Sequence, residues 1–226
     1  MSSPTAPSAK SGLTWGLLVI ALVAALLYLL PATADIRWLH LLTKPIPVLC
    51  MAVWVAWQPQ RGRYQVLVAS GLVLGAAGDV LLELGDSTFI LGLLAFLLGH
   101  VAYIIAFLQD DRRLSPVRAL LSYGYGIAIF AYLLTAGDLG AMLAPVAIYM
   151  LVICTMLWRG LSRLGAPAAP ERSAQAGAVG SVLFIASDSL LSLRMFVAAF
   201  PPVGVAIMLT YWLGQLGVAA SARITR

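Results

Sequence analysis

The sequence contains very little charge. Only 10% of its 226 residues are Asp, Glu, Lys or Arg, whereas 62% are hydrophobic. A soluble domain usually carries about 25% charged residues, so this chain has too little polar surface to cover a soluble globule. The composition therefore excludes a soluble enzyme or binding module and indicates an integral membrane protein.

Histidine and cysteine are also scarce, with two of each. Cys50 and Cys154 fall inside apolar runs, which argues against a disulfide framework. His40 lies at the mouth of its run and the cysteines are badly placed for zinc, so no metal site is predicted. The chain also lacks a G-x-S-x-G sequence, the usual signature of serine acyl transfer. We predict neither a metal nor an organic cofactor.

Long apolar runs, in contrast, fill the chain. They are continuous rather than alternating, which favours membrane helices over a β-barrel. We predict an all-α polytopic membrane protein with eight transmembrane helices, at 13–31, 37–57, 64–84, 88–108, 116–135, 139–158, 174–196 and 201–220.

The connections between these spans are too short for a separate soluble domain. The predicted organisation is one eight-helix membrane domain, 13–220, between short cytoplasmic tails at 1–12 and 221–226. We interpret the first span as a retained helix rather than a signal peptide, because no convincing cleavage site follows it.

The basic residues predict the orientation. If the termini share one side with the loops after spans two, four and six, that side holds eleven of the 14 basic residues. By the positive-inside rule, both termini are then cytoplasmic. The net charge of +5 gives a basic cytoplasmic face that attracts anionic membrane lipids, and we predict no nucleic-acid partner. The expected location is a bacterial inner membrane.

Two aspartates lie within the apolar spans. Asp79 and Asp188 are each surrounded by similar sequence, since segments 77–84 and 186–193 share Ala, Asp and three Leu at matching positions. A charged group at membrane depth costs a few kcal/mol or more, so such a residue is a functional candidate by default. A purely structural role, with each carboxyl hydrogen-bonded inside a packed interface, is the alternative.

The spans that carry the aspartates are four spans apart and run in the same direction. Leu98-Gly-His100 and Leu213-Gly-Gln215, on the spans that follow, are a second corresponding pair. Both pairs are compatible with a four-plus-four parallel duplication. Its pseudo-twofold axis would make the aspartates face one another. At about 1.5 Å per residue, they lie roughly 22 Å and 21 Å from the cytoplasmic ends of their spans.

Further polar residues are candidates for binding substrate or for tuning the acidity of the aspartates. They are Lys44, His100, Tyr103, Tyr211, Gln215, Glu83 and Ser187. Lys44 is the natural counter-ion for one or both aspartates. Glu83 follows Asp79 by four residues on the same helical face. His100 alone is also compatible with an ordinary core histidine.

Five elements from span two to span eight form a pattern. They are Lys44-Pro45, Gly78-Asp79, Phe89-x-x-Gly92-x-x-x-Phe96-x-x-x-His100-x-x-Tyr103, Ser187-Asp188 and Tyr211-x-x-x-Gln215. Together they resemble the YhhN family of eight-span membrane proteins, which includes the lysoplasmalogenases. The string in span four is the most specific element.

The resemblance implies hydrolysis of the vinyl ether bond of a 1-alkenyl lysophospholipid. The products would be a fatty aldehyde and glycerophosphoethanolamine or glycerophosphocholine. This chemistry needs an acid that keeps its proton and a carboxylate that activates water, and two facing aspartates divide in that way. We therefore expect Asp79 and Asp188 to be catalytic, in an order that the sequence leaves open. The partners are the lysophospholipid and membrane lipids, with no obligate protein partner.

Two other functions fit parts of the sequence. A proton- or cation-coupled transporter of a small molecule or lipid would use the same intramembrane aspartates, and the duplication would support alternating access. An intramembrane aspartyl protease also needs two aspartates. However, 75–79 does not match its G-x-G-D pattern, and the expected Tyr-Asp and Pro-Ala-Leu elements are absent.

Overall fold

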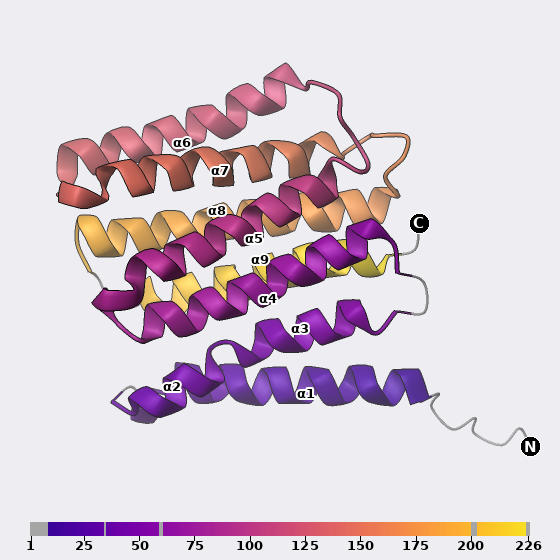
Figure 1. Cartoon of the computed structure of the whole chain (residues 1–226), viewed down its shortest axis with the longest axis horizontal. Helices are drawn as coiled ribbons and strands as arrows, with labels where there is room; N and C mark the ends of the chain where they lie inside the picture. Colours follow the sequence, from indigo (N-terminus) through magenta and orange to yellow (C-terminus); the bar gives the residue numbers. More distant parts are fainter. Residues whose placement is uncertain (1–8, 34, 59–60, 200–202, 225–226) are drawn as a thin grey trace, which may run out of the picture.

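The computed structural model describes residues 9–33, 35–58, 61–199 and 203–224. Within these ranges the regular structure is entirely helical. Eight helical segments are long and apolar enough to cross a membrane, which confirms the predicted class and number. Figure 1 shows these segments lying side by side in one bundle. Most of the predicted tail at 1–12, and the predicted break at 201–202, fall outside the described residues.

The helix ends lie close to the predicted span limits. The helices are α1 (Ala9–Leu29), α2 (Arg37–Thr43), α3 (Ile46–Ala56), α4 (Arg63–Glu83), α5 (Phe89–Phe107), α6 (Pro116–Ala136), α7 (Leu143–Ser162), α8 (Glu171–Phe196) and α9 (Val203–Arg223). Short 3-10 turns at Pro31–Thr33, Asp86–Thr88 and Gly140–Met142 precede α2, α5 and α7. The helices α1, α7, α8 and α9 extend three or four residues beyond the predicted limits, because polar turns continue a helix after its apolar run has ended.

Span two is broken, although the sequence analysis treated it as one helix. It consists of α2 and α3, separated at Lys44 and Pro45. Pro45 and Pro47 lack a backbone N–H and cannot donate to the carbonyls one turn earlier, so regular helical bonding stops there. The indole Nε1 of Trp212 on α9 donates to the carbonyl of Lys44 at 3.4 Å. The break frees the carbonyl of Lys44 for this bond, which holds the backbone of Lys44 against α9.

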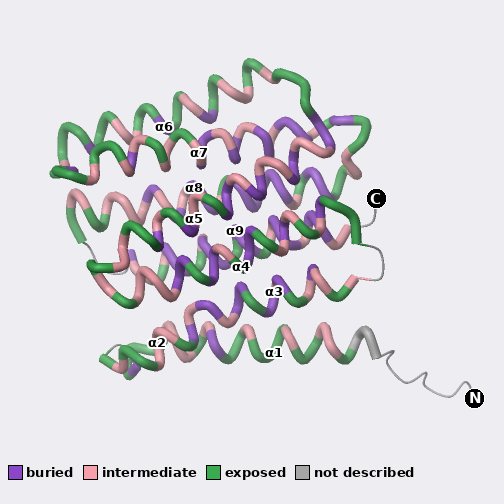
Figure 2. Tube along the Cα trace, viewed as in Figure 1, coloured by how far each residue is buried: buried purple, intermediate pink, exposed green. Residues whose placement is uncertain are grey.

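Four helices make the centre of the bundle. The most extensive packing joins α4 to α5 and α8 to α9. Figure 2 shows buried positions concentrated along these helices, whereas α1 and α6 at the two edges are mostly exposed. An apolar surface of this kind is expected to face lipid. Apart from Lys44, at the break between α2 and α3, the polar residues of interest lie on the central helices and on α7.

The two central pairs share a detail of their packing. A Cβ atom added to Gly99 would lie 3.1 Å from the carbonyl oxygen of Gly71, and one added to Gly214 would lie 3.1 Å from that of Gly180. Gly71 lies eight residues before Asp79, and Gly180 lies eight residues before Asp188. Equivalent glycines thus make equivalent close contacts in the two halves, which supports the four-plus-four duplication.

One buried ionic cluster joins the helices near one end of the bundle. Helix α1 begins and α9 ends at this end, which we call the termini end (Figure 1). Arg163, just after α7, is fully buried, and its Nε donates to Oδ2 of Asp110 at 2.8 Å. Its other nitrogens donate to the backbone and hydroxyl of Ser173 at 3.1 and 2.7 Å.

Aromatic rings complete this group, which we call the Arg163 cluster. The guanidinium lies 5.1 Å from the ring centres of both Tyr64 and Phe107. Its members come from α4, α5, the loop after α5, the end of α7 and α8. The sequence analysis used Arg163 only to orient the chain, but the structure gives it a buried, fully engaged role.

Candidate active site

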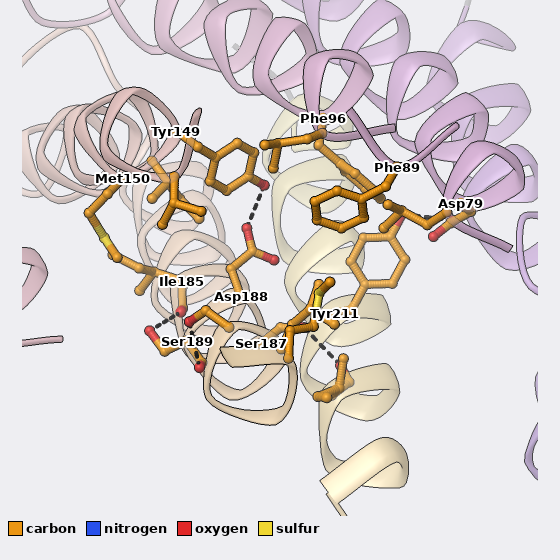
Figure 3. A pocket seen from close by; sticks show the side chains of 18 of the residues that line it. Asp79, Phe89, Phe96, Tyr149, Met150, Ile185, Ser187, Asp188, Ser189 and Tyr211 are labelled. Atoms are coloured by element: carbon orange, nitrogen blue, oxygen red, sulfur yellow. Dashed lines mark hydrogen bonds between the residues drawn. The ribbon is translucent and has the colours of Figure 1, made fainter. Parts of the chain in front are cut away.

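A cavity of about 110 Å³ lies in the half of the bundle away from the termini end. Helices α4, α5, α7, α8 and α9 form its walls, and most of the side chains that line it are apolar. Its polar lining residues are Lys44, Asp79, Tyr149, Ser187, Asp188, Ser189, Ser192 and Tyr211. Both intramembrane aspartates thus reach a single apolar-walled cavity (Figure 3).

Asp79 ends a hydrogen-bonded chain that crosses three helices. The Tyr211 hydroxyl on α9 donates to Oδ2 of Asp79 at 2.8 Å. Gln215, one turn along α9, donates from Nε2 to the Tyr211 oxygen at 3.4 Å, and its Oε1 accepts from the Tyr103 hydroxyl of α5 at 2.6 Å. All four side chains are buried. The structure thus joins four residues that the sequence analysis had selected separately, and we call them the Asp79 relay.

Glycines on α4 make room for the Asp79 relay. A Cβ atom at Gly75 would lie 2.7 Å from Nε2 of Gln215, and one at Gly71 would lie 2.3 Å from the ring of Tyr103. Neither position could carry a larger side chain without displacing a relay residue. These glycines therefore serve the polar site as well as helix packing, the role that small residues usually have in membrane bundles.

Asp188 has a different partner, Tyr149 of α7. The Tyr149 hydroxyl donates to Oδ2 of Asp188 at 2.6 Å. Asp188 is only partly buried, whereas Asp79 has 1% of its surface exposed. Tyr149 was not among the predicted site residues. Its signal was a tyrosine in the middle of an apolar run, where the hydroxyl needs a protein partner because no water surrounds it.

The two aspartates share the cavity without pairing directly. No hydrogen bond joins their carboxyls among the described residues, and each carboxyl accepts from its own tyrosine. In Figure 3 the ring of Tyr211 lies between Asp79 and Asp188. The predicted facing arrangement therefore takes the form of two separate carboxyls on one cavity.

Lys44 pairs with a glutamate rather than with an aspartate. Its Nζ donates to Oε2 of Glu83 at 3.1 Å, and Nδ1 of His40 lies 3.8 Å from the other oxygen of Glu83. Lys44 nonetheless lines the cavity beside Asp79. The break between α2 and α3 brings this cation to the cavity wall, where it contributes positive charge near Asp79.

His100 and Ser187 are buried close to the site. The His100 ring has 1% of its surface exposed and lies 4.6 Å from the ring of Phe184 and 5.4 Å from that of Tyr149, measured between centroids. It packs behind Tyr149 and is not part of the cavity wall. The Ser187 hydroxyl donates to the carbonyl of Ile207 at 2.9 Å, which ties α8 to α9.

The described residues contain no group of three or more His, Cys, Asp or Glu side chains that could hold a metal ion. The polar groups that line the cavity are carboxyl, hydroxyl and ammonium groups. Two carboxyls with separate donors in an apolar cavity can supply one acid and one base.

Comparison with known proteins gives consistent results. The chain is similar to two curated proteins, each called lysoplasmalogenase TMEM86B, from Homo sapiens and Rattus norvegicus. It is 36% identical to the human protein and 46% identical to the rat protein, in each case over 81 residues that make up 36% of this chain.

These matches span 31% of the human protein and 30% of the rat protein, so they cover about a third of the length of either relative. No solved structure is significantly similar to this chain. The profile of the YhhN family, however, matches residues 39–222, which is most of the chain and includes both aspartates and every residue of the Asp79 relay. The chain belongs to the YhhN family.

Proposed function

We propose that this protein is a lysoplasmalogenase, an ether hydrolase that cleaves the vinyl ether bond of 1-alkenyl lysophospholipids within the membrane. The observation that carries the proposal is the pair of aspartates on one apolar-walled cavity. The names of the two curated relatives support it. The products are a fatty aldehyde and glycerophosphoethanolamine or glycerophosphocholine.

The reaction requires three things from a protein. An acid must protonate the carbon of the double bond that is not attached to oxygen, which we call the outer carbon. This step leaves an oxocarbenium ion at the carbon attached to oxygen, the inner carbon. A base must help water to add to the adjacent carbon, and the resulting hemiacetal then collapses to aldehyde and alcohol. A carboxylate also stabilises the cation through its charge. Asp79 and Asp188 supply two carboxyls, and water is the only co-reactant.

The walls of the cavity suit an aliphatic substrate. Phe89, Leu93, Phe96, Met150 and Ile153 line it beside the polar groups. An alkenyl chain gains from contact with such a surface, and the low dielectric strengthens the interactions of each carboxyl with a charged intermediate. A saturated ether has no double bond to protonate, so the same site would leave it intact.

The test is aldehyde release by the purified full-length protein in detergent. The substrates are a 1-alkenyl lysophospholipid and the matched saturated 1-alkyl ether. The variants are Asp79→Asn and Asp188→Asn, with Asp138→Asn as a control, because the Asp138 side chain is exposed and is not part of the cavity lining. We expect aldehyde from the alkenyl lipid alone, little from either cavity variant, and normal release from the control.

Failure has a clear meaning in this experiment. If the well-folded protein releases no aldehyde, the proposed hydrolysis is wrong. Proton-dependent uptake into vesicles without chemical change would then favour the transporter alternative.

We also propose that both termini face the cytoplasm of a bacterial inner membrane, because most basic residues lie at one predicted side. Reaction of cysteines introduced at residues 61 and 86 with an impermeant reagent on intact cells tests this, since only the second should react.

A further inference from the structure

Resting on the proposed vinyl ether hydrolysis, we propose a division of labour: Asp188 is the acid that protonates the alkenyl carbon, Asp79 is the base that takes a proton from water, and Tyr149 positions Asp188. The structure supports this assignment because the two carboxyls have different surroundings, as the contacts of each one show in turn.

Asp188 is suited to keeping its proton. Its one hydrogen bond comes from Tyr149 to Oδ2, which leaves the other oxygen to carry a proton, and in Figure 3 that oxygen points into the cavity. No described Lys, Arg or His lies within ion-pair distance of it. An apolar pocket without a cation favours the neutral form of a carboxyl. Asp188 is also the less buried of the two, as a group that must touch substrate should be.

Asp79 is suited to being charged. Lys44 lines the same cavity and brings positive charge near it, an effect that the pairing of Lys44 with Glu83 reduces, while Tyr211 donates to its Oδ2 at 2.8 Å. Gln215 donates to the Tyr211 oxygen, and such a chain strengthens the donation from Tyr211 to the carboxylate. The ionisable groups among the described residues that line the cavity are Lys44, Asp79, Tyr149, Asp188 and Tyr211. Lys44 is the one basic group among them, and its charge acts on Asp79 rather than on Asp188.

Because both carboxyls line one cavity, two successive proton transfers can be written for the adjacent carbons of one bound vinyl ether. Asp188 gives its proton to the outer carbon, and the π electrons form the new C–H bond. Water then attacks the inner carbon and loses a proton to Asp79. When the hemiacetal collapses, Asp188 takes the proton of its hydroxyl and Asp79 returns its proton to the leaving glycerol oxygen. Both residues regain their starting forms, and one water has been consumed.

Chemical rescue distinguishes the two roles. Asp188→Ala and Asp79→Ala are assayed with acetate at a fixed total concentration, at several pH values across the titration of acetic acid. Asp188→Ala should be rescued by the undissociated acid, so the rescue grows as the pH falls. Asp79→Ala should be rescued by the acetate ion, so its rescue grows as the pH rises. The reverse dependence, or the same dependence in both variants, would overturn the assignment.

A second measurement serves if a cavity is closed to acetate or a variant does not fold. Tyr149→Phe and Tyr211→Phe each remove one donor to one carboxyl, and we expect each to lower kcat about tenfold with little change in KM. Tyr149→Phe should raise the solvent deuterium isotope effect on kcat, because carbon protonation becomes more rate-limiting. Tyr211→Phe should lower it, because water addition becomes slower.

The control for this measurement is Tyr123→Phe. It removes a hydroxyl that bonds Thr155 between α6 and α7, outside the cavity, and should leave both kcat and the isotope effect unchanged. Equal changes of the isotope effect in Tyr149→Phe and Tyr211→Phe would contradict the assignment. Both experiments use a wild-type protein that releases aldehyde, so a failure of the assignment is distinct from a failure of the proposed function.

Discussion

Two of the buried polar clusters in the bundle, the Arg163 cluster and the residues at the cavity, differ in how fully their hydrogen-bonding groups are paired. In the Arg163 cluster the guanidinium donates to Asp110 and twice to Ser173, and two aromatic rings cover its faces. At the cavity, Asp188 accepts from Tyr149 alone and lies partly exposed. Buried charge that is fully paired holds helices together, whereas a carboxyl with a free oxygen on a cavity remains able to react.

Because of this difference, mutations in the Arg163 cluster and mutations at the cavity should have different effects. Removing one partner from a saturated buried cluster leaves an uncompensated charge, so stability should fall. Replacing an aspartate of the cavity by asparagine removes a group that can donate or accept a proton but changes the packing little. Activity should therefore fall while the fold persists. Variants of the Arg163 cluster should therefore mainly lose stability, and variants of the cavity should mainly lose activity.

The largest effect is expected at the cavity. Asp79→Asn and Asp188→Asn should each lower aldehyde release about 10²- to 10⁴-fold, the usual contribution of a general acid or base. The unfolding temperature should stay near that of the wild type, as measured by thermal denaturation in detergent. Activity within threefold of wild type in either variant would remove that aspartate from the mechanism.

The next largest effect is expected in the Arg163 cluster. Arg163→Met should lower the free energy of unfolding by about 3–5 kcal/mol, because Asp110 loses a buried cation. Adding Asp110→Asn to this variant should recover part of the loss. Unfolding of the single variant at the wild-type temperature would show that the cluster contributes no net stability.

Two glycines offer a matched comparison of the groups. At Gly180 an added Cβ would lie 2.6 Å from the backbone nitrogen of Val218, so Gly180→Ala should push α8 from α9 and cost about 1–3 kcal/mol. At Gly75 the nearest atom belongs to the side-chain amide of Gln215 rather than to a backbone, so Gly75→Ala should mainly disturb the Asp79 relay. We expect the first variant to lose thermal stability and the second to lose activity; the opposite pattern would contradict the comparison.

The smallest effect concerns Asp111, which lies in the loop after α5. Burial opposes its charge, but hydrogen bonds from Arg113 and the charges of Arg113 and Arg159 hold its pKa below the ordinary value. The charged form therefore stabilises the fold at pH values above the ordinary pKa, and this contribution is lost as the pH falls through the lowered pKa.

Asp111→Asn should thus cost at most about 1 kcal/mol at neutral pH, since Arg113 is largely exposed. The difference between variant and wild type should shrink in acid, which denaturation at a series of pH values can measure. A difference that grows as the pH falls would show that the charged form of Asp111 does not stabilise the fold.

Much of the fold could be predicted from the sequence. Apolar length sets the number and approximate limits of the membrane helices, and the depth of Asp79 and Asp188 follows from their distance to the span ends. The recurrence of Gly71 with Gly99 and of Gly180 with Gly214 matches the duplication that the two aspartate segments suggested.

The partners of individual side chains could not be predicted. They depend on how each helix is rotated and tilted, and helices that are apolar on every side give little periodic signal. Lys44 therefore pairs with Glu83 instead of an aspartate, and Tyr149 was not recognised as the donor to Asp188. The interruption at Pro45 was missed because an apolar run remains continuous in hydropathy even where its hydrogen bonding stops.

The small size of the cavity has a consequence for how lipids are chosen. A volume of about 110 Å³ is well below the roughly 300–1,000 Å³ of pockets that hold a drug-sized ligand. For the hydrolysis proposed above, such a space would hold the reacting bond and the carbons next to it, and the remainder of the aliphatic tail would lie outside the cavity. The rate of the proposed reaction should then depend on the bond and its immediate neighbours and only weakly on the length of the tail.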